Sequence, residues 1–341
     1  MPQTTLKALI HKVADAKALS EEEMRTALEI MTDGHATQAQ MGAFLMALRV
    51  RGETVEEITG AAQMMRSKMR RVTAPPGAVD IVGTGGDAHG TYNVSTCASL
   101  VAAGAGLKIA KHGNRSVSSL AGASDVLAQL GVKLDVDIPT VERAIAEAGV
   151  GFMFAPNHHP AMKHWAPVRA ELGVRNIFNL LGPISNPASV TRQLVGVYSW
   201  QWVEPVAQVL AKLGAEHVWV VHGHDGLDEL TTTGSTDVAE VRDGKVTVFE
   251  VTPADAGLPP AKLSDLKGGD PAFNAAAIRA VLDGQTGPFR DIVLLNTAAA
   301  LIVGGKVEML PEGVALAARS IATGAARAAL AKLVEVTNRA V

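Results

Sequence analysis

Residues 79–96 read VDIVGTGGDAHGTYNVST, and their pattern indicates the fold class. Val79 to Val82 form a short apolar run of the kind that fills a buried strand, and Ser95 to Ala103 have the composition of a helix. A glycine-rich turn, GTGGD at residues 83–87, joins the two. A buried strand that leads through a tight turn into a helix is the unit from which mainly parallel sheets covered by helices are built.

The same alternation continues through the rest of the chain. The pattern predicts strands at Leu107–Ala110, Phe152–Phe154, Leu194–Tyr198, Val218–Val221 and Ile292–Asn296, and helices at Gly122–Leu130, Val203–Leu213 and Pro271–Leu282. Asp237 to Val251 differ, because Asp243-Gly244 between two alternating runs predicts an antiparallel hairpin. The alanine-rich tail from Gly313 to Arg339 predicts a closing helix. We therefore expect an α/β fold with a mainly parallel central sheet and a C-terminal helical region.

Before residue 75 the pattern is helical only. Three hydroxyl residues are each followed three positions later by an acid or an amide, which is the spacing that caps helix starts. The pairs are Ser20 and Glu23, Thr37 and Gln40, and Thr54 and Glu57. Another helix is predicted around Leu6 to Val13, and TAPPG at residues 73–77 ends the helical pattern. We expect a small all-helical domain over residues 1–74 and a larger α/β domain over residues 75–341.

Composition limits the class of protein. The chain has 341 residues, of which 48% are hydrophobic and 19% charged, so it can bury a sizeable core, and a domain size of roughly 150 residues suggests about two domains. The 31 Lys and Arg against 34 Asp and Glu leave a charge of -3, which argues against a general nucleic-acid surface. The single cysteine, Cys97, excludes an internal disulfide framework. The longest apolar candidate, Ile292 to Val303, is broken by Asn296 and Thr297 and is too short to span a bilayer. We expect a soluble, cytoplasmic protein with no membrane or nucleic-acid partner.

The turns that follow the strands carry the candidate chemistry, because ligands bind beyond the carboxyl ends of parallel strands. The first is GTGGD, whose glycines let the backbone approach an anion, with Asn93, Ser95 and Thr96 at the start of the next helix. It is neither a Rossmann fingerprint, since Ala88 takes the third glycine position, nor a Walker loop. The turn predicts a phosphate or diphosphate cradle; an ordinary capped turn is the alternative.

Two further turns add charge of opposite sign. KHGNRS at residues 111–116 offers two cations suited to a polyanion, Lys as a point charge and Arg as a fork, unless it is a solvated basic turn. GLDE at residues 226–229 offers hard oxygen ligands suited to Mg²⁺, unless the pair is a surface or helix-start feature. His222 and His224 nearby do not favour zinc, because no thiolate accompanies them, and His158-His159-Pro160 is interpreted as a loop wall.

Together these segments resemble the anthranilate phosphoribosyltransferase family. The matching pieces, in chain order, are GTGGD at 83–87, NVST at 93–96, KHGNR at 111–115, HPAM at 159–162 followed by Arg169, NLLGPISNP at 179–187 and GLDE at 226–229. The resemblance implies a pentosyltransferase of tryptophan biosynthesis, which moves phosphoribose from 5-phosphoribosyl 1-diphosphate (PRPP) to the amine of anthranilate with Mg²⁺ and releases diphosphate. It also implies a homodimer formed through the helical domain, with helical segments from about 165–190 packed on that domain.

The resemblance also implies roles for individual positions. PRPP would contact Gly83, Gly86, Asp87, Thr91, Asn93, Val94, Ser95, Thr96, Lys111, His112, Gly113, Asn114, Arg115, Ser116, Val117, Ser118, Ser119 and Ala123. Anthranilate would contact Gly83, Asn114 and Arg169, with His112, His159 and Pro183 along its route. Magnesium would be held by Ser95, Asp228 and Glu229. His158 departs from relatives that carry an aromatic residue there.

The chemistry of such a transfer agrees with the residues present. An aromatic amine is neutral at pH 7, and no Ser-His-Asp or Cys-His constellation is apparent, so no residue is assigned as an acid or base. Lys111, Asn114 and Arg169 would act by positioning, and Arg169 offers a planar fork for the anthranilate carboxylate. Two alternatives share the architecture: a pyrimidine nucleoside phosphorylase, which would not need the acidic pair, and a non-catalytic nucleic-acid-binding relative, which would need a basic groove.

Overall fold

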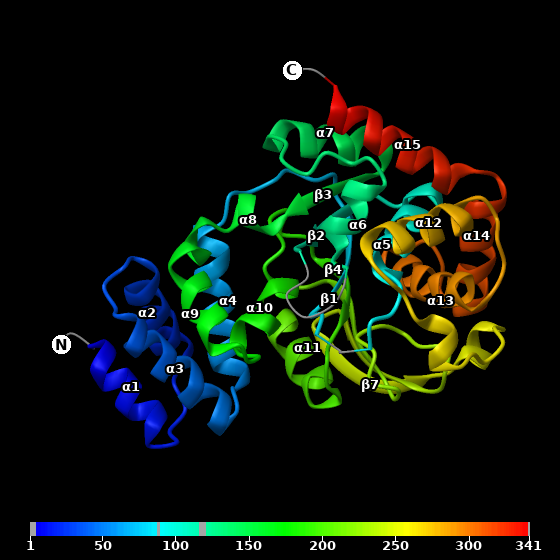
Figure 1. Ribbon diagram of the computed structural model, residues 1–341. Coiled ribbons are helices and arrows are strands. Elements are labelled where there is room, and N and C mark those ends of the chain that lie inside the picture. The colour runs from blue at the N-terminus through cyan, green and yellow to red at the C-terminus, as the bar shows by residue number, and fades with distance from the viewer. Residues whose placement is uncertain (1–4, 87–88, 116–120, 340–341) are drawn as a thin grey trace.

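The computed structural model describes residues 5–86, 89–115 and 121–339, and in these ranges the strands form one seven-stranded sheet in the order β3-β2-β1-β4-β5-β6-β7 (Figure 1). The strands are β1 Val79–Gly83, β2 Ile109–Gly113, β3 Val150–Phe154, β4 Arg192–Gly196, β5 His217–Gly223, β6 Thr236–Arg242 and β7 Lys245–Val251. The first five are parallel, and β6 and β7 are antiparallel, with Asp243-Gly244 at their turn. The predicted α/β class, the mainly parallel sheet and the hairpin are confirmed.

Alternate residues of the strands serve apolar cores on opposite faces of the sheet. In β5, Trp219 and Val221 belong to one apolar cluster, whereas Val218 and Val220 belong to another. Helices that contribute to the first cluster are α5 Val94–Gly104, α6 Ala123–Gln129, α7 Ile138–Ala148, α12 Pro271–Leu282, α13 Pro288–Val303, α14 Leu310–Ala322 and α15 Ala325–Asn338. Both faces are therefore buried, as a parallel sheet requires.

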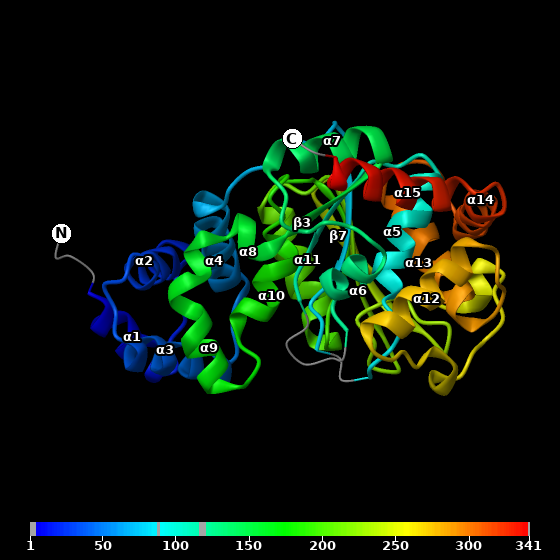
Figure 2. The ribbon, with the colours of Figure 1, turned by 45° about the horizontal axis from the view of Figure 1, so that its top comes forward.

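The second cluster joins the amino-terminal helices to the other face of the sheet. Its helices are α1 Leu6–Ala14, α2 Glu21–Thr32, α3 Gln38–Arg51, α4 Val55–Lys68, α9 Trp165–Leu172, α10 Ile177–Ile184 and α11 Val203–Lys212. Trp165 of α9 is fully buried and donates from Nε1 to Thr32 Oγ1 of α2 over 3.1 Å. Figures 1 and 2 both show α9 and α10, in green, beside the blue helices, although more than 90 residues separate them along the chain.

Short helices complete the chain. They are α8 Ala155–His158 and the 3-10 helices η1 Pro160–His164, η2 Trp200–Trp202, η3 Pro253–Ala256 and η4 Leu263–Leu266. At the amino end, the three predicted capping pairs are confirmed: Ser20 accepts from the Glu23 N–H, and the same reciprocal pattern starts α3 and α4. Each cap satisfies backbone groups that would otherwise lack partners at a helix start.

Two predicted elements are wrong. Ile292 to Asn296 is not a strand but lies inside α13, whose side chains are buried nearly all round, so that its apolar run shows no helical period. The tail from Gly313 to Arg339 is not one helix, because Gly324 in the left-handed region (φ 76°) separates α14 from α15. Smaller differences are the strand predicted at Leu107–Ala110, which runs from Ile109 to Gly113, and β4, which begins and ends two residues earlier than predicted.

Within the described ranges, no single helix is long and apolar enough to cross a membrane. In the same part of the chain, α14 and α15 are long and apolar enough when taken together, but they are bent by 62° at their junction.

Candidate active site

The carboxyl ends of the parallel strands meet at one edge of the sheet, and the GLDE loop after β5 folds back onto this edge. A Cβ atom built on Gly196, at the end of β4, would overlap the backbone of Asp228, and one on Gly83, at the end of β1, would overlap the Asp228 carboxylate. Asp228 therefore lies directly against two strand ends, in space that only glycine leaves open.

The acidic pair is held by the predicted cradle. The Gly85 N–H donates to Asp228 Oδ2 over 2.6 Å, and the Ser95 N–H donates to Glu229 Oε1 over 3.1 Å. Ser95 lies in the first turn of α5, where free N–H groups and the helix dipole favour negative charge. The structure thus brings together Ser95, Asp228 and Glu229, the three positions expected to hold magnesium.

Lys111 of β2 also contacts this group through its ammonium nitrogen. Its Nζ donates to the Ile81 carbonyl over 2.5 Å and lies 3.3 Å from Ser95 Oγ, and the side chain is only 3% exposed. Burial lowers the pKa of Lys111, while the carboxylates of Asp80, Glu229 and Asp228 act in the opposite direction. The ammonium group is therefore buried beneath the cradle, where it contacts strand β1 and helix α5.

The donor set fits a hard divalent cation. Glu229 is bound at the start of α5, Asp228 is bound by the Gly85 N–H of the cradle, and the Ser95 hydroxyl lies beside Lys111, so two carboxylates and one hydroxyl offer oxygen ligands here. Oxygen donors of this kind suit Mg²⁺, which is bound through few carboxylates and keeps several waters.

The other cradle positions have mainly structural contacts. Asn93 joins two helix starts, since its Nδ2 donates to the Ala121 carbonyl and its Oδ1 accepts from Asn274. Gly86 has a φ of 77°, which glycine tolerates best, and Thr91 bridges to Lys267 in an isolated antiparallel pair. Val94 is buried at the start of α5 and Ala123 starts α6.

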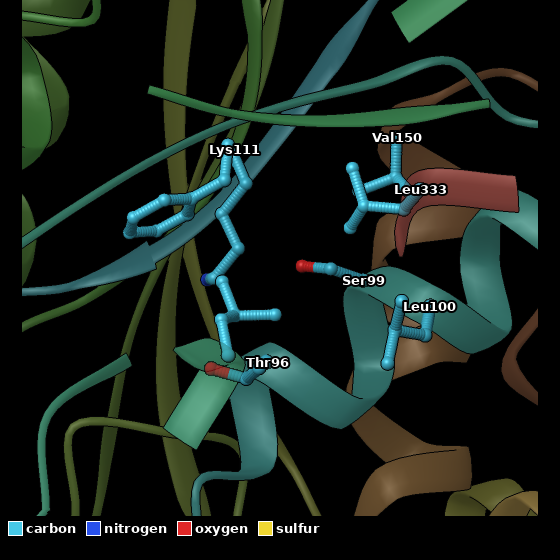
Figure 3. A pocket seen from close by; sticks show the side chains of 8 residues that line it. Thr96, Ser99, Leu100, Lys111, Val150 and Leu333 are labelled. Carbon is cyan, nitrogen blue, oxygen red and sulfur yellow. The ribbon is translucent and has the colours of Figure 1, made fainter. Parts of the chain in front are cut away.

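Thr96 faces the interior rather than the cradle. It is 1% exposed and lines a cavity of about 10 Å³ between α5, β2 and β3, together with Ser99, Lys111 and Phe152 (Figure 3). A space of this size holds about one water molecule. PRPP binding by Thr96 stays a prediction.

The turn after β2 is exposed at its tip. Gly113 ends β2, and a Cβ atom there would press on the Phe152 ring. Asn114 and Arg115 are exposed, with the Asn114 side chain accepting from the Arg115 N–H and the Arg115 guanidinium lying 5.8 Å from the centre of the Phe154 ring. Asp87, Ser116, Val117, Ser118 and Ser119, all predicted PRPP contacts, lie outside the described residues.

A pair of buried histidines connects this turn to α10. His112 Nδ1 lies 3.1 Å from the Gly182 carbonyl, so Nδ1 carries the hydrogen and Nε2 accepts; His159 Nε2 donates to it over 3.2 Å. Pro183 is buried beside Gly182 in α10. The structure therefore places His112, His159 and Pro183 together, as the predicted anthranilate route requires.

Arg169 and His158 contact other segments. The Arg169 guanidinium lies 5.4 Å from the centre of the Phe178 ring of α10, and partial burial lowers its pKa from the usual value. His158 is buried, with Nδ1 3.1 Å from the Arg70 carbonyl. His158 thus faces the link between the amino-terminal helices and β1.

The buried histidines predict a pH dependence of stability. Burial, helped by His158, lowers the pKa of His159 from 6.5 to about 4, so between these values the unfolded chain binds a proton that the folded chain does not. The contribution of neutral His159 to the free energy of unfolding is fully present above pH 6.5 and is lost as the pH falls. Between pH 7.5 and pH 5 this loss is about 2 kcal/mol for His159 alone. Urea unfolding of the wild type and of His159→Gln should show a smaller pH effect in the variant.

Exposed His35 offers the matched control for that measurement, because it lies outside any buried cluster. His35→Gln should retain the wild-type difference between pH 7.5 and pH 5. An undiminished difference in His159→Gln would contradict the assignment of a neutral buried imidazole.

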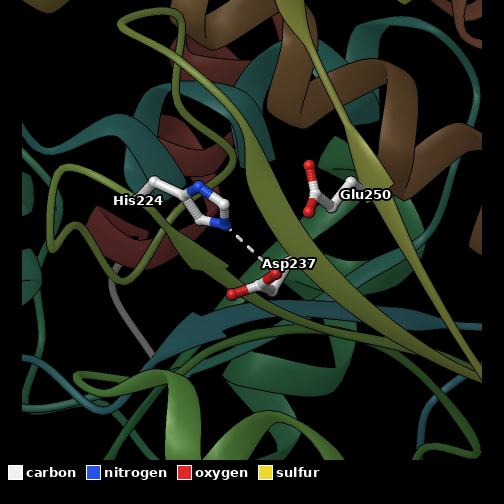
Figure 4. A group of neighbouring side chains, drawn as sticks. All are labelled: His224, Asp237 and Glu250. Atoms are coloured by element: carbon white, nitrogen blue, oxygen red, sulfur yellow. Dashed lines mark hydrogen bonds and ion pairs between the residues drawn. The ribbon is translucent and has the colours of Figure 1, made fainter.

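The two histidines at the end of β5 lie apart from the cradle. His222 Nδ1 is bound to the Val197 carbonyl at 2.7 Å, whereas His224 Nε2 lies 3.1 Å from Asp237, and Glu250 lies opposite Asp237 on β7 (Figure 4). Ligand atoms of His224, Asp237 and Glu250 fall within 4.8 Å of one another. The group is partly exposed and contains a hydrogen bond of its own, and it supplies no residue of the predicted site.

Sequence reasoning missed several residues that build the site. Asp80 and Asn186 form a buried hydrogen bond of 2.7 Å, and Gly196 makes room for Asp228. A charged residue inside an apolar strand was a usable signal for Asp80, because such a group needs partners when buried. Asn186 lies in the NLLGPISNP segment already noted, whereas nothing local marked Gly196.

Comparisons with known proteins agree with this geometry. Residues 75–327 match the glycosyl transferase family, α/β domain, and residues 7–69 match the glycosyl transferase family, helical bundle domain. The chain is 61% identical to anthranilate phosphoribosyltransferase of Parvibaculum lavamentivorans over 335 residues, which are 98% of each chain. The chain belongs to the anthranilate phosphoribosyltransferase family.

Solved structures of anthranilate phosphoribosyltransferases share the fold over nearly the whole chain. The enzyme of Thermus thermophilus is 44% identical, with a TM-score of 0.92 and coverage of 97% of this chain and 99% of that one. The enzyme of Saccharomyces cerevisiae in complex with PRPP and Mg is 31% identical, with a TM-score of 0.89 and coverage of 98% of each chain. The chain is therefore an enzyme of the glycosyltransferase class, and the alternatives considered from the sequence have no support among these relatives.

Proposed function

We propose that this chain transfers the phosphoribosyl group of PRPP to the amine of anthranilate and releases diphosphate, with Mg²⁺, as a step in tryptophan biosynthesis. The observation that carries the proposal is the convergence of Ser95, Asp228 and Glu229 on a glycine-rich cradle at the carboxyl edge of the sheet. Family membership and the yeast relative with PRPP and Mg support it.

The cradle would bind the diphosphate end of PRPP. Backbone N–H groups at Gly85 and Ser95 already hold carboxylates, so they are oriented for anionic oxygen, and Lys111 adds a fixed positive charge beneath them. Donors held in place before the reaction stabilise charge that develops on the leaving diphosphate without reorganising. When bound by Ser95, Asp228 and Glu229, magnesium would supply further positive charge to the same oxygens.

The acceptor would enter from the side of α9 and α10. His112 and His159 are neutral at pH 7, because burial lowers the pKa of both rings. They therefore line this side of the site with polar groups that carry no positive charge. Arg169 would pair with the anthranilate carboxylate, the group that distinguishes this substrate from aniline. The amine is neutral, so orientation against the ribose carbon is the main task of this side of the site.

Arg169→Ala is expected to raise the KM of anthranilate about 10- to 100-fold, since a charge-assisted hydrogen bond contributes ~1.5–3 kcal/mol. The KM of PRPP should change less than about threefold. Steady-state kinetics with each substrate varied in turn would measure both values. Arg175→Ala is the matched control, because the Arg175 guanidinium also lies over an aromatic ring, that of Tyr198 at 4.6 Å, but Arg175 is not among the residues predicted to contact anthranilate. Equal effects on both KM values would move Arg169 out of the acceptor site.

The proposed function is tested by the fluorescence of anthranilate. Loss of fluorescence on mixing the protein with anthranilate, PRPP and Mg²⁺ is expected, with no loss when PRPP is omitted. Cleavage of a pyrimidine nucleoside by inorganic phosphate, measured in parallel, would instead indicate the phosphorylase. No PRPP-dependent loss would refute the proposal.

Assembly, location and boundaries stay predictions. We propose a cytoplasmic location and a homodimer formed through the helical domain, where α1 and α3 leave a hollow lined by Lys7, Ile10, His11, Ala39, Gln40 and Ala43. A solution mass of one chain in light scattering would contradict the dimer. The proposed domain boundaries stay at residues 1–74 and 75–341.

A further inference from the structure

Asp80 is the second residue of β1, where three segments of the site meet. Its Oδ1 accepts from the backbone N–H of His112 over 3.1 Å, and its Oδ2 accepts from Asn186 Nδ2 over 2.7 Å. The same Asn186 amide donates to the Ala110 carbonyl over 2.9 Å. One carboxylate thus ties the start of the 111–115 turn and the segment after α10 to the strand that ends in Gly83.

Burial makes this arrangement costly unless the charge is compensated. Asp80 is 0% exposed, and a buried carboxylate needs hydrogen bonds and an opposite charge. Lys111 supplies the charge from the neighbouring strand, where its side chain points to the α5 face while Asp80 points to the α10 face. Burial raises the pKa of Asp80 to about 6, and Lys111 opposes that rise, so the carboxylate is ionised at pH 7.

The charges that surround Lys111 explain why a carboxylate is needed at position 80. The charges acting on Lys111 are those of Asp80, Glu229 and Asp228. Glu229 and Asp228 lie at the cradle, where cation and diphosphate would meet them. Of these three carboxylates, Asp80 lies on the face of the sheet opposite the ligand.

We propose that Asp80 is a positioning residue, which holds the 111–115 turn and the segment after α10 in the arrangement that receives PRPP. The proposal rests on the proposed function and adds a residue that touches neither substrate. A purely structural carboxylate would change stability when removed but would leave substrate affinity alone, so the two roles are separable.

Asp80→Asn in the full chain tests the proposal. The amide can still accept from the His112 N–H, but it removes the charge and turns an N–H₂ group toward the Asn186 amide. We expect the KM of PRPP to rise at least about 10-fold, with kcat within about threefold of wild type. Ser320→Ala is the control: it removes a buried hydrogen bond to the Val101 carbonyl far from the cradle, so it should lower the melting temperature without changing either KM.

A second variant keeps the proposal testable if Asp80→Asn does not fold. Asn186→Ala retains the Asp80 charge but removes one of its two donors, so it should raise the KM of PRPP in the same direction by about threefold. A folded Asp80→Asn with the wild-type KM of PRPP, or in its absence an Asn186→Ala with that KM, overturns the proposal.

Failure of the proposed function is recognised separately. The wild type must consume anthranilate in the same assay, and its inactivity would refute the function and not the role of Asp80. The rise in melting temperature on adding PRPP and Mg²⁺ without anthranilate provides a readout that needs no turnover. This rise should be smaller in the variants than in wild type, and an equal rise would count against Asp80 as a positioning residue.

Discussion

Replacing Asp228 by Asn and Glu229 by Gln together is expected to lower kcat/KM at least about 100-fold, which is the scale of losing preorganised charge stabilisation. The amide oxygens can still accept from the Gly85 and Ser95 N–H groups, so the loop should keep its place while its negative charge is lost. The concentration of Mg²⁺ that gives half-maximal activity should rise as well. A titration of turnover with Mg²⁺, in wild type and variant, would measure both effects.

Asp237→Asn is the matched control for the acidic pair. Asp237 is a carboxylate on β6 that pairs with His224 and, among the described residues, has no hydrogen bond to the cradle, so its loss should leave the Mg²⁺ titration unchanged. An unaltered titration in the Asp228 and Glu229 double variant would remove these residues from the metal site.

Gly196→Ala should reduce activity by about 100-fold although residue 196 is not itself expected to touch substrate. Its Cβ atom would overlap the backbone of Asp228, so the 226–229 loop must move away from the cradle. A displacement of about 1 Å at a catalytic group can cost about 100-fold in rate. Activity measured with saturating substrates, beside the melting temperature, would separate displacement of the loop from unfolding.

Gly234→Ala provides the comparison for this substitution. Gly234 lies in the same loop region, has an ordinary φ, and has no atom within 4 Å of the position that a Cβ would take. Activity should remain at the wild-type level. If Gly196→Ala were as active as Gly234→Ala, the close approach of Asp228 to β4 would not matter for turnover.

Much of the architecture follows from local signals in the sequence. The strand at Val79, the three helix caps and the Asp243-Gly244 turn each depend on residues within a few positions, and each was predicted. The run from Ile292 to Asn296 shows the limit, because a helix buried on all sides has the same composition as a buried strand.

The individual motifs of the site were predictable from the sequence, but the contacts between them were less so. The cradle, the basic turn and the acidic pair were found from motifs, since each lies in a turn after a strand. Their mutual contacts were not, because Gly85 and Asp228 are 143 residues apart and meet only through the order of the strands. The Lys111 ammonium contacts the Ile81 carbonyl and Ser95 Oγ, partners that the sequence did not indicate, and its contact with PRPP stays a prediction.

The apolar cluster that runs from α1 to the sheet has a consequence for how the chain can be divided. Leu28 of α2, Trp165 of α9 and Val220 of β5 belong to this one interior, although the two family matches meet between residues 69 and 75. A cut at that junction would leave the apolar sides of α9 and α10 facing water on the larger piece. The amino-terminal helices are thus a separate segment of the sequence, but their apolar side chains share one core with α9, α10 and the sheet. Exchanging them between relatives therefore requires exchanging α9 and α10 as well.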